Sequence, residues 1–230
     1  MRRFYAEAAV RSHGDAHAIL LDGRPVKTPA KAPLAVPARA LADAIAAEWN
    51  AQGAKIEPRT MPLTGLAHAA IDRVAPDPGA FAAGLARYGE NDLLCYRADA
   101  PAALVRRQAE AWDPLLAWAR RRFDVDLTVT AGVIHRAQPA ITVERLARAV
   151  TAHDAFRLAA LSPLITIAGS LVIALALAEG AISFDEAWRA ATIDESWQAE
   201  QWGEDAEAAA ALANRRAEFE AAYRFLTLVA

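Results

Sequence analysis

The sequence predicts an α+β protein in which a small, antiparallel, β-rich N-terminal domain precedes a larger, mainly α-helical domain. The first forty residues contain short, loosely alternating apolar stretches separated by Gly and Asp, as is typical of strands joined by tight turns. Prolines then stand at positions 25, 29, 33 and 37, which favours short edge strands and turns. Beyond this point the apolar residues recur with the period of a helix. We therefore expect a β-rich domain with one helix at 1–58 and a mainly helical domain at 59–230.

The expected N-terminal sheet has two principal strands. The first spans residues 4–10 and the second residues 18–21. Gly14-Asp15 supplies turn chemistry between them, and Asp22-Gly23 after the second strand is a strong hairpin signal. A small antiparallel sheet follows from these signals.

A helix is expected directly after Pro37. Leu41, Ile45 and Trp49 share one of its faces, and Gly53 suits its C-terminal end. Further helical patterns recur along the rest of the chain, at residues 64–74, 79–89, 102–123, 143–160, 164–178, 183–202 and 206–227.

Two places in the helical part are less regular. Asp113-Pro114 interrupts the apolar stripe of 102–123. Asp113 suits the N-cap of a helix and Pro114 its first position, which predicts a kink or two abutting helices. Alternation across 125–130, followed by Val133-Ile134, could add another strand or two.

Composition narrows the function. A net charge of −3 and a pI near 6.0 argue against nucleic acid, because phosphate binding favours a basic stripe. Leu158–Ala178 carries no charge and is long enough to span a bilayer. Polar and Gly residues dilute its first half, so we interpret it as a buried helix; a peripheral membrane role remains a weaker alternative. The N-terminal residues show no signal peptide, and a reducing compartment fits the single cysteine.

No catalytic motif stands out. His13 and His17 are four residues apart, but Gly14-Asp15 between them predicts a surface turn and no third ligand follows. Ser170 has neither a nucleophile-elbow nor a phosphate-loop context. Cys95 lies in an apolar run and is interpreted as a packed residue. We therefore expect no catalytic residue, no metal and no cofactor.

The segment 182–207 is the most informative. Ser183 and Glu186 form a capping box. On one continuous helix, Glu195 would share the stripe of Phe184 and Trp188, where a carboxylate is costly to bury without a partner. One interpretation is an internal ion pair with an Arg cluster; the other is a groove that awaits a donor from a binding partner. Between Arg189 and Arg215 every charged residue is acidic, namely Asp194, Glu195, Glu200, Glu204, Asp205 and Glu207.

Several short motifs occur in a characteristic order along roughly residues 2–228. They are Arg3-Phe4-Tyr5, Leu21–Pro29, Ala47-Glu48-Trp49 with Gln52-Gly53, Met61–Thr64, Asp92–Arg97, Trp112–Leu116, Asp194–Gln198 and Gln201-Trp202-Gly203. In this order and spacing the chain resembles the assembly chaperones that bind the ATP synthase alpha subunit in mitochondria and alphaproteobacteria. Gly65 and His68 differ from the residues that are usual at these positions in that family.

The resemblance implies a nonenzymatic protein that holds the newly made alpha subunit until the beta subunit displaces it. It assigns a functional role to Glu195, and Trp49 is interpreted as a packing residue. We expect transient contact with the alpha subunit by a monomer in the bacterial cytoplasm, or in the mitochondrial matrix for a trimmed eukaryotic chain, without nucleic acid or membrane insertion. The alternative function is a hydrolase with Glu195 as general base in an apolar pocket. The expected contact residues are Asp194, Glu195, Trp197, Gln198 and Trp202.

Overall fold

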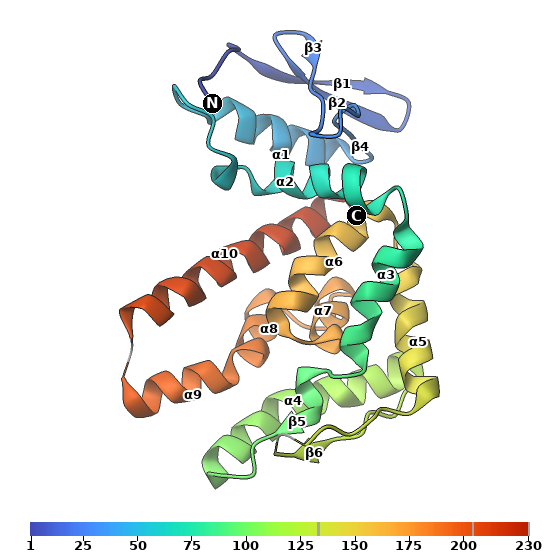
Figure 1. Cartoon of the computed structure of the whole chain (residues 1–230), viewed down its shortest axis with the longest axis vertical. Helices are drawn as coiled ribbons and strands as arrows, with labels where there is room; N and C mark the ends of the chain where they lie inside the picture. Colours follow the sequence, from blue (N-terminus) through green and yellow to red (C-terminus); the bar gives the residue numbers. More distant parts are fainter. Residues whose placement is uncertain (133, 204, 230) are drawn as a thin grey trace. The chain divides into compact units, whose positions relative to one another are not determined.

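A computed structural model describes residues 1–132, 134–203 and 205–229. The chain divides into two compact units. The N-terminal unit comprises residues 1–78, 154–160 and 221–230, and the helical unit comprises 79–153 and 161–220. An antiparallel sheet at the N-terminus followed by helices confirms the predicted α+β class (Figure 1). The domain boundary expected at residue 58 stays a prediction.

The N-terminal sheet is antiparallel. β1 (Ala8–His13) pairs with β2 (Ala16–Leu21), whose other partners are β3 (Arg24–Pro25) and β4 (Ala35–Val36). The register joins Ala8 to Leu21 and His13 to Ala16, so both histidines of the predicted turn lie in a hairpin. β1 begins later than predicted because the N–H groups of residues 6 and 7 donate to the Asp22 carboxylate at 3.0 Å instead of joining the ladder.

α1 (Arg39–Asn50) contacts β1 and β2 on one side and α2 (Pro62–Ala69) on another (Figure 1). Leu41, Ile45 and Trp49 are buried on α1 as predicted. Glu48 of the same helix reaches the start of α2, where its carboxylate accepts the N–H groups of Leu63 and Thr64, both at 2.8 Å. These are orphan donors of a helix N-terminus, so Glu48 caps α2 from outside. A π-helical turn, η2 (Ala70–Val74), follows.

The helical unit is built around α7 (Leu171–Ala178), in which every residue from Leu171 to Leu177 is buried. α4 (Ala102–Phe123) and α8 (Phe184–Ala191) contact it. The remaining helices of the chain are α3 (Pro78–Ala86), α5 (Ala140–Thr151), α6 (Ala155–Ala168), α9 (Ile193–Trp202) and α10 (Ala206–Val229). α6 and α10 each have residues in both units.

Three predicted helices are each divided in the structure. The 143–160 pattern breaks before α6, where Asp154 accepts the N–H of Phe156 at 2.8 Å. The 164–178 pattern breaks at Gly169, which has φ +62°, and at Ser170, which caps α7. The 183–202 pattern breaks at Thr192. Side chains that bond the backbone locally explain the first two breaks, because they compete with a continuous helix.

At Asp113-Pro114 a kink or two abutting helices were expected. α4 runs through Pro114 as one helix, so the alternative of two helices is wrong. The side of α4 that carries Trp112, Leu115, Leu116 and Ala119 is buried, and this packing outweighs the backbone hydrogen bond that a proline removes.

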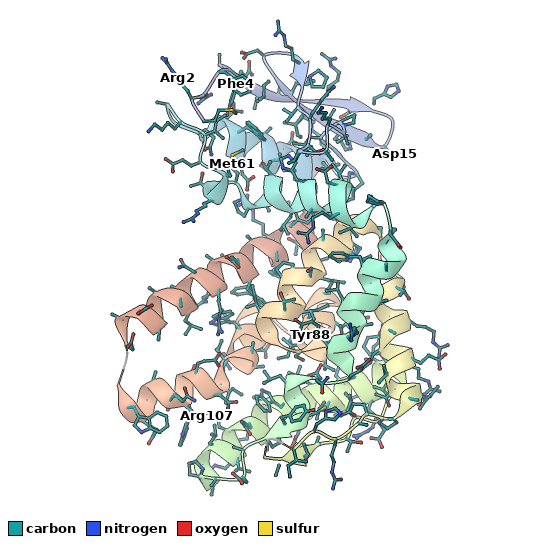
Figure 2. All side chains as sticks on the ribbon, viewed as in Figure 1. Arg2, Phe4, Asp15, Met61, Tyr88 and Arg107 are labelled. Atoms are coloured by element: carbon teal, nitrogen blue, oxygen red, sulfur yellow. The ribbon has the colours of Figure 1, made fainter. Side chains whose placement is uncertain are left out.

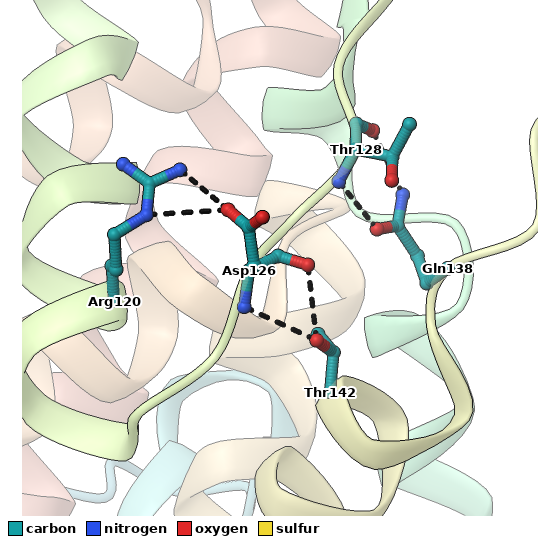
Figure 3. Close-up of polar contacts among 5 residues, drawn as sticks. All are labelled: Arg120, Asp126, Thr128, Gln138 and Thr142. Carbon is teal, nitrogen blue, oxygen red and sulfur yellow. Dashed lines mark hydrogen bonds and ion pairs between the residues drawn. The ribbon is translucent and has the colours of Figure 1, made fainter.

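The segment after α4 is held mainly by side chains (Figure 3). Asp126 accepts from Arg120 at 2.7 Å, and Thr142 donates to the Asp126 carbonyl at 3.0 Å. The amide of Gln138 exchanges two hydrogen bonds with the backbone of Thr128, at 2.8 and 3.0 Å. One of the further strands expected here exists as β6 (Thr130–Ala131), parallel to β5 (Tyr96–Arg97). Val133 lies outside the described residues.

The uncharged stretch Leu158–Ala178 forms parts of α6 and the whole of α7. Across the part of the chain that the structure describes, no helix has both the length and the apolarity needed to cross a membrane. The interpretation of this stretch as buried helix is confirmed for α7.

Asp92 is a fully buried carboxylate that fixes the start of α7. It accepts the Ser170 hydroxyl at 2.7 Å and the Val172 N–H at 3.0 Å, and from its own loop the Leu94 N–H at 3.0 Å. Burial raises the pKa of Asp92, and these donors partly oppose the rise because they favour the charged form.

We predict that Asp92→Ala destabilises the protein by about 3 kcal/mol, because buried donors lose their acceptor. Urea denaturation followed by circular dichroism measures the change. Asp99→Ala is the matched control, since Asp99 is exposed, and its effect should be small. Equal losses from the two variants would contradict the role assigned to Asp92.

Cys95 is buried, and burial together with the nearby Asp92 charge raises its pKa to about 12. An unfolded cysteine has a pKa of about 8.5. We therefore predict that the native thiol reacts with Ellman's reagent at weakly alkaline pH at least about a thousandfold more slowly than the thiol in guanidinium, because the thiolate is the nucleophile. Comparable native and unfolded rates would contradict this.

Candidate partner-binding surface

α9 projects most of its side chains outward. It begins after the break at Thr192, whose hydroxyl donates to the Trp188 carbonyl at 2.8 Å. Within α9 only Ile193 is buried. The single continuous helix expected over 183–202 is therefore divided at Thr192. α10 contacts both parts: Phe219 packs against Phe184 and Trp188 of α8, and Arg215 pairs with Glu195 of α9.

One side of α9 borders a hollow of about 440 Å³. The first half of α10 forms its other wall. Alanines and Leu212 make up most of that wall, so the hollow is largely apolar between charged ends. Its lining consists of Glu195, Gln198, Ala199, Trp202, Gly203, Asp205, Ala208, Ala209, Ala211, Leu212 and Arg215.

Glu195 forms an ion pair with Arg215 across this hollow. Their closest atoms are 2.8 Å apart, and the side chains are 44% and 42% exposed. Glu195 thus has an internal Arg partner from the Arg215-Arg216 pair, and it also lines a groove, so features of both interpretations are present. A half-exposed, ion-paired carboxylate lacks the apolar enclosure that the general-base alternative requires.

The other side of α9 borders a hollow of about 600 Å³, lined partly by residues of the 93–108 segment. Gln108 of α4 joins α9 to the 93–108 segment. Its amide N–H donates to Asp194 at 2.7 Å, and its amide oxygen accepts the Ala98 N–H at 2.8 Å. Gln108 is 2% exposed. Asp194 is therefore partly occupied in holding α9 against α4.

Trp197 is covered by Arg107, labelled in Figure 2, whose guanidinium lies 5.0 Å from the centre of the indole ring. The same guanidinium binds both oxygens of Glu200, at 2.7 and 2.8 Å. The hydrogen bonds from Arg107 lower the pKa of the Glu200 carboxyl. This stack leaves Trp197 only partly exposed.

Trp202 is the most exposed aromatic residue on α9, with 79% of its surface accessible. It lines both hollows, as does Gln198. Within residues 1–132, 134–203 and 205–229, no ring contact or side-chain hydrogen bond is present for either residue. An indole exposed between two hollows offers apolar area to a partner at little cost in ordering.

The five predicted contact residues thus come together around two adjacent hollows, which we call the α9 surface: Asp194, Glu195, Trp197, Gln198 and Trp202. Sequence reasoning considered an Arg cluster as a partner of Glu195, but it singled out none of Arg107, Gln108 and Arg215. The Arg pairs were visible in the sequence, but nothing there connects position 107 with position 200. Glu204, one of the acidic residues of this segment, lies outside the described residues.

Comparison with known proteins gives consistent matches. The sequence profile of the ATP12 chaperone protein family matches residues 2–120. The chain is 26% identical over 214 residues to the mitochondrial protein atp12 of Schizosaccharomyces pombe, covering 88% of this chain and 74% of that protein. It is 46% identical to the crystal structure of Atp12 from Paracoccus denitrificans, with a TM-score of 0.95 and coverage of 100% and 98%. Atu1473 of Agrobacterium tumefaciens is 42% identical, with a TM-score of 0.95 and coverage of 100% and 86%.

The exposure of the Glu195–Arg215 pair generates a stability prediction. Glu195→Gln should lower the free energy of unfolding by less than about 1 kcal/mol, because half-exposed ion pairs contribute little. Gln108→Ala should cost about 1–3 kcal/mol, because it leaves the part-buried Asp194 carboxylate and Ala98 N–H without this partner. Urea denaturation of both variants measures the difference, and a larger loss from Glu195→Gln would overturn this ranking.

Proposed function

Because this chain belongs to the ATP12 chaperone family, we propose that it is an assembly chaperone for ATP synthase that binds the unassembled alpha subunit of the catalytic head. In this proposal it keeps the alpha subunit from aggregating and releases it to the beta subunit. A subunit made for large interfaces exposes apolar patches while it is alone, and such patches aggregate.

The exposed indole of Trp202 is the observation that supports the α9 surface as the contact site. Tryptophan is enriched at the centres of protein interfaces. Here it is 79% exposed and stands beside the largely alanine-lined hollow between α9 and α10. We propose that an apolar segment of the alpha subunit covers this indole and enters the hollow.

Each polar residue of the α9 surface has a separate proposed role. Gln198 is exposed and offers its amide to the backbone of the partner. The Glu195–Arg215 pair is open to solvent, so a partner can bind either charge without a large desolvation cost. Asp194 and Trp197 are already held by Gln108 and Arg107 and contribute shape at the edge of the contact.

A transient chaperone needs only a modest affinity for its client. Modest affinity lets the beta subunit displace the chaperone by mass action once it occupies the same surface of the alpha subunit. We further propose that the protein acts as a monomer and without catalysis, in the bacterial cytoplasm or, for a eukaryotic mature chain, in the mitochondrial matrix.

Light scattering of unfolded alpha subunit, freshly diluted into buffer, tests this function. A stoichiometric amount of the protein should suppress the scattering, and protection should end when beta subunit takes over. No suppression, while a general chaperone works in the same assay, would contradict the proposed function.

Variants test the contact surface separately. Trp202→Ala and Glu195→Lys should abolish most of the protection while circular dichroism shows an intact fold. Ile134→Ala is the matched control, because Ile134 is 77% exposed and does not line either hollow. If folded Trp202→Ala and Glu195→Lys protect as well as the wild type, the α9 surface is not the contact site.

A further inference from the structure

The N-terminal unit contains its own hollow, of about 630 Å³, which we call the N-terminal pocket. This volume lies within the range of ligand pockets, about 300–1,000 Å³. None of its residues belongs to the α9 surface. Its lining consists of Met1, Phe4, Tyr5, Leu21, Asp22, Arg24, Pro25, Val26, Lys27 and Trp49.

Three aromatic rings follow one another along this pocket. Phe4 and Tyr5 meet edge to face with ring centres 5.5 Å apart, and Tyr5 and Trp49 do so at 5.6 Å. Tyr5 and Trp49 are buried, and the Tyr5 hydroxyl donates to the Trp49 carbonyl at 2.6 Å. Phe4, labelled in Figure 2, is 65% exposed. A rigid aromatic floor therefore leads to a large, accessible ring at the rim.

The charged residues of the pocket differ in whether they already have hydrogen-bond or ion-pair partners. Both Arg24 and Lys27 are exposed, and within the described ranges neither side chain forms an ion pair or a hydrogen bond. The one acidic residue, Asp22, already accepts N–H groups of residues 6 and 7. Backbone donors hold the pKa of Asp22 below its usual value. The pocket thus presents two cations and one carboxylate that is hydrogen-bonded internally. The Arg24 charge lies near that carboxylate and helps to lower the Asp22 pKa.

Arg3 is not available to bind a ligand, because its guanidinium already has internal partners. Its guanidinium donates to the carbonyls of Tyr5, Ala6 and Gln52 and lies 4.7 Å from the centre of the Tyr5 ring. It is a structural residue that holds the N-terminal segment against the end of α1. The side-chain cations that line the pocket are therefore Arg24 and Lys27.

We propose that the N-terminal pocket binds an extended acidic peptide segment of a partner protein. An apolar side chain of the segment packs on Phe4 and the aromatic floor, and an adjacent carboxylate pairs with Arg24 and Lys27. Charge complementarity supports this occupant, because the two cations lie beside exposed apolar area. The net charge of −3 makes nucleic acid a poor alternative.

Fluorescence anisotropy with two designed probes tests the proposal. The first is a short fluorescein-labelled peptide in which Glu alternates with Leu and Phe, and in the second Gln replaces every Glu. The acidic peptide should bind about tenfold more tightly than the Gln peptide, as expected for two partly exposed ion pairs. Raising the salt concentration should reduce this difference.

Variants test whether the peptides bind in the N-terminal pocket. The double variant Arg24→Glu/Lys27→Glu should lose the preference for the acidic peptide, and Phe4→Ala should weaken binding of both peptides. Arg59→Glu is the matched control, because Arg59 is exposed in the same unit but does not line the pocket. Trp202→Ala should bind the peptides as the wild type does, which separates this site from the α9 surface.

Three results would overturn the proposal. The first is equal affinity for the acidic and Gln peptides. The second is a double variant, shown by circular dichroism to be folded, that keeps the wild-type preference. The third is an Arg59→Glu control that loses this preference.

Discussion

The helical unit depends on the buried carboxylate of Asp92. This carboxylate accepts hydrogen bonds from its own loop and from the start of α7. α7 is the buried helix around which the unit is built. The Leu93 N–H adds a backbone bond to the Gly169 carbonyl at 3.0 Å. Burying a carboxylate is costly unless donors surround it. The arrangement therefore specifies one position of the loop relative to the helix, since only that position satisfies every group.

α4 links α7 to the α9 surface, because it packs against α7 and forms hydrogen bonds to the end of α8 and the start of α9. Trp112 of α4 is fully buried and donates its indole N–H to the Ala190 carbonyl at the end of α8, at 2.8 Å. One turn earlier, Gln108 holds Asp194 at the start of α9. Both hydrogen bonds fix the place where α8 ends and α9 begins. The exposed residues of α9 are thus presented by a rigid support, which reduces the ordering cost of binding.

The motifs that carry the family resemblance mostly perform this structural work. Glu48 caps α2, Asp92 fixes α7, and Arg97 bonds the Leu94 carbonyl and Asp113 at 2.9 and 2.8 Å. These residues are polar and lie near the end of α1, in a loop and in the short strand β5, where backbone groups need partners. The Asp194–Trp202 stretch differs, because several of its side chains remain open to solvent.

Much of the fold could be predicted from local patterns. The hairpin, the α1 face and the range 102–123 of α4 follow from turn chemistry and helical period. The breaks at Gly169 and Thr192 were missed, because apolar periodicity continues across them. The α9 residues were predicted as a group, but the Arg107, Gln108 and Arg215 contacts were not. Those contacts join residues 20 to 93 positions apart, and no local pattern encodes them.

Photocrosslinking from position 202 tests the central claim most directly. A photoreactive phenylalanine analogue would replace Trp202, and another would replace Ile134 as the control, before illumination with freshly diluted alpha subunit. We predict a crosslink to the alpha subunit from position 202 that disappears when beta subunit is present, and little from position 134. Crosslinking from position 134 alone, while the alpha subunit stays protected, would contradict the claim that α9 presents the contact surface.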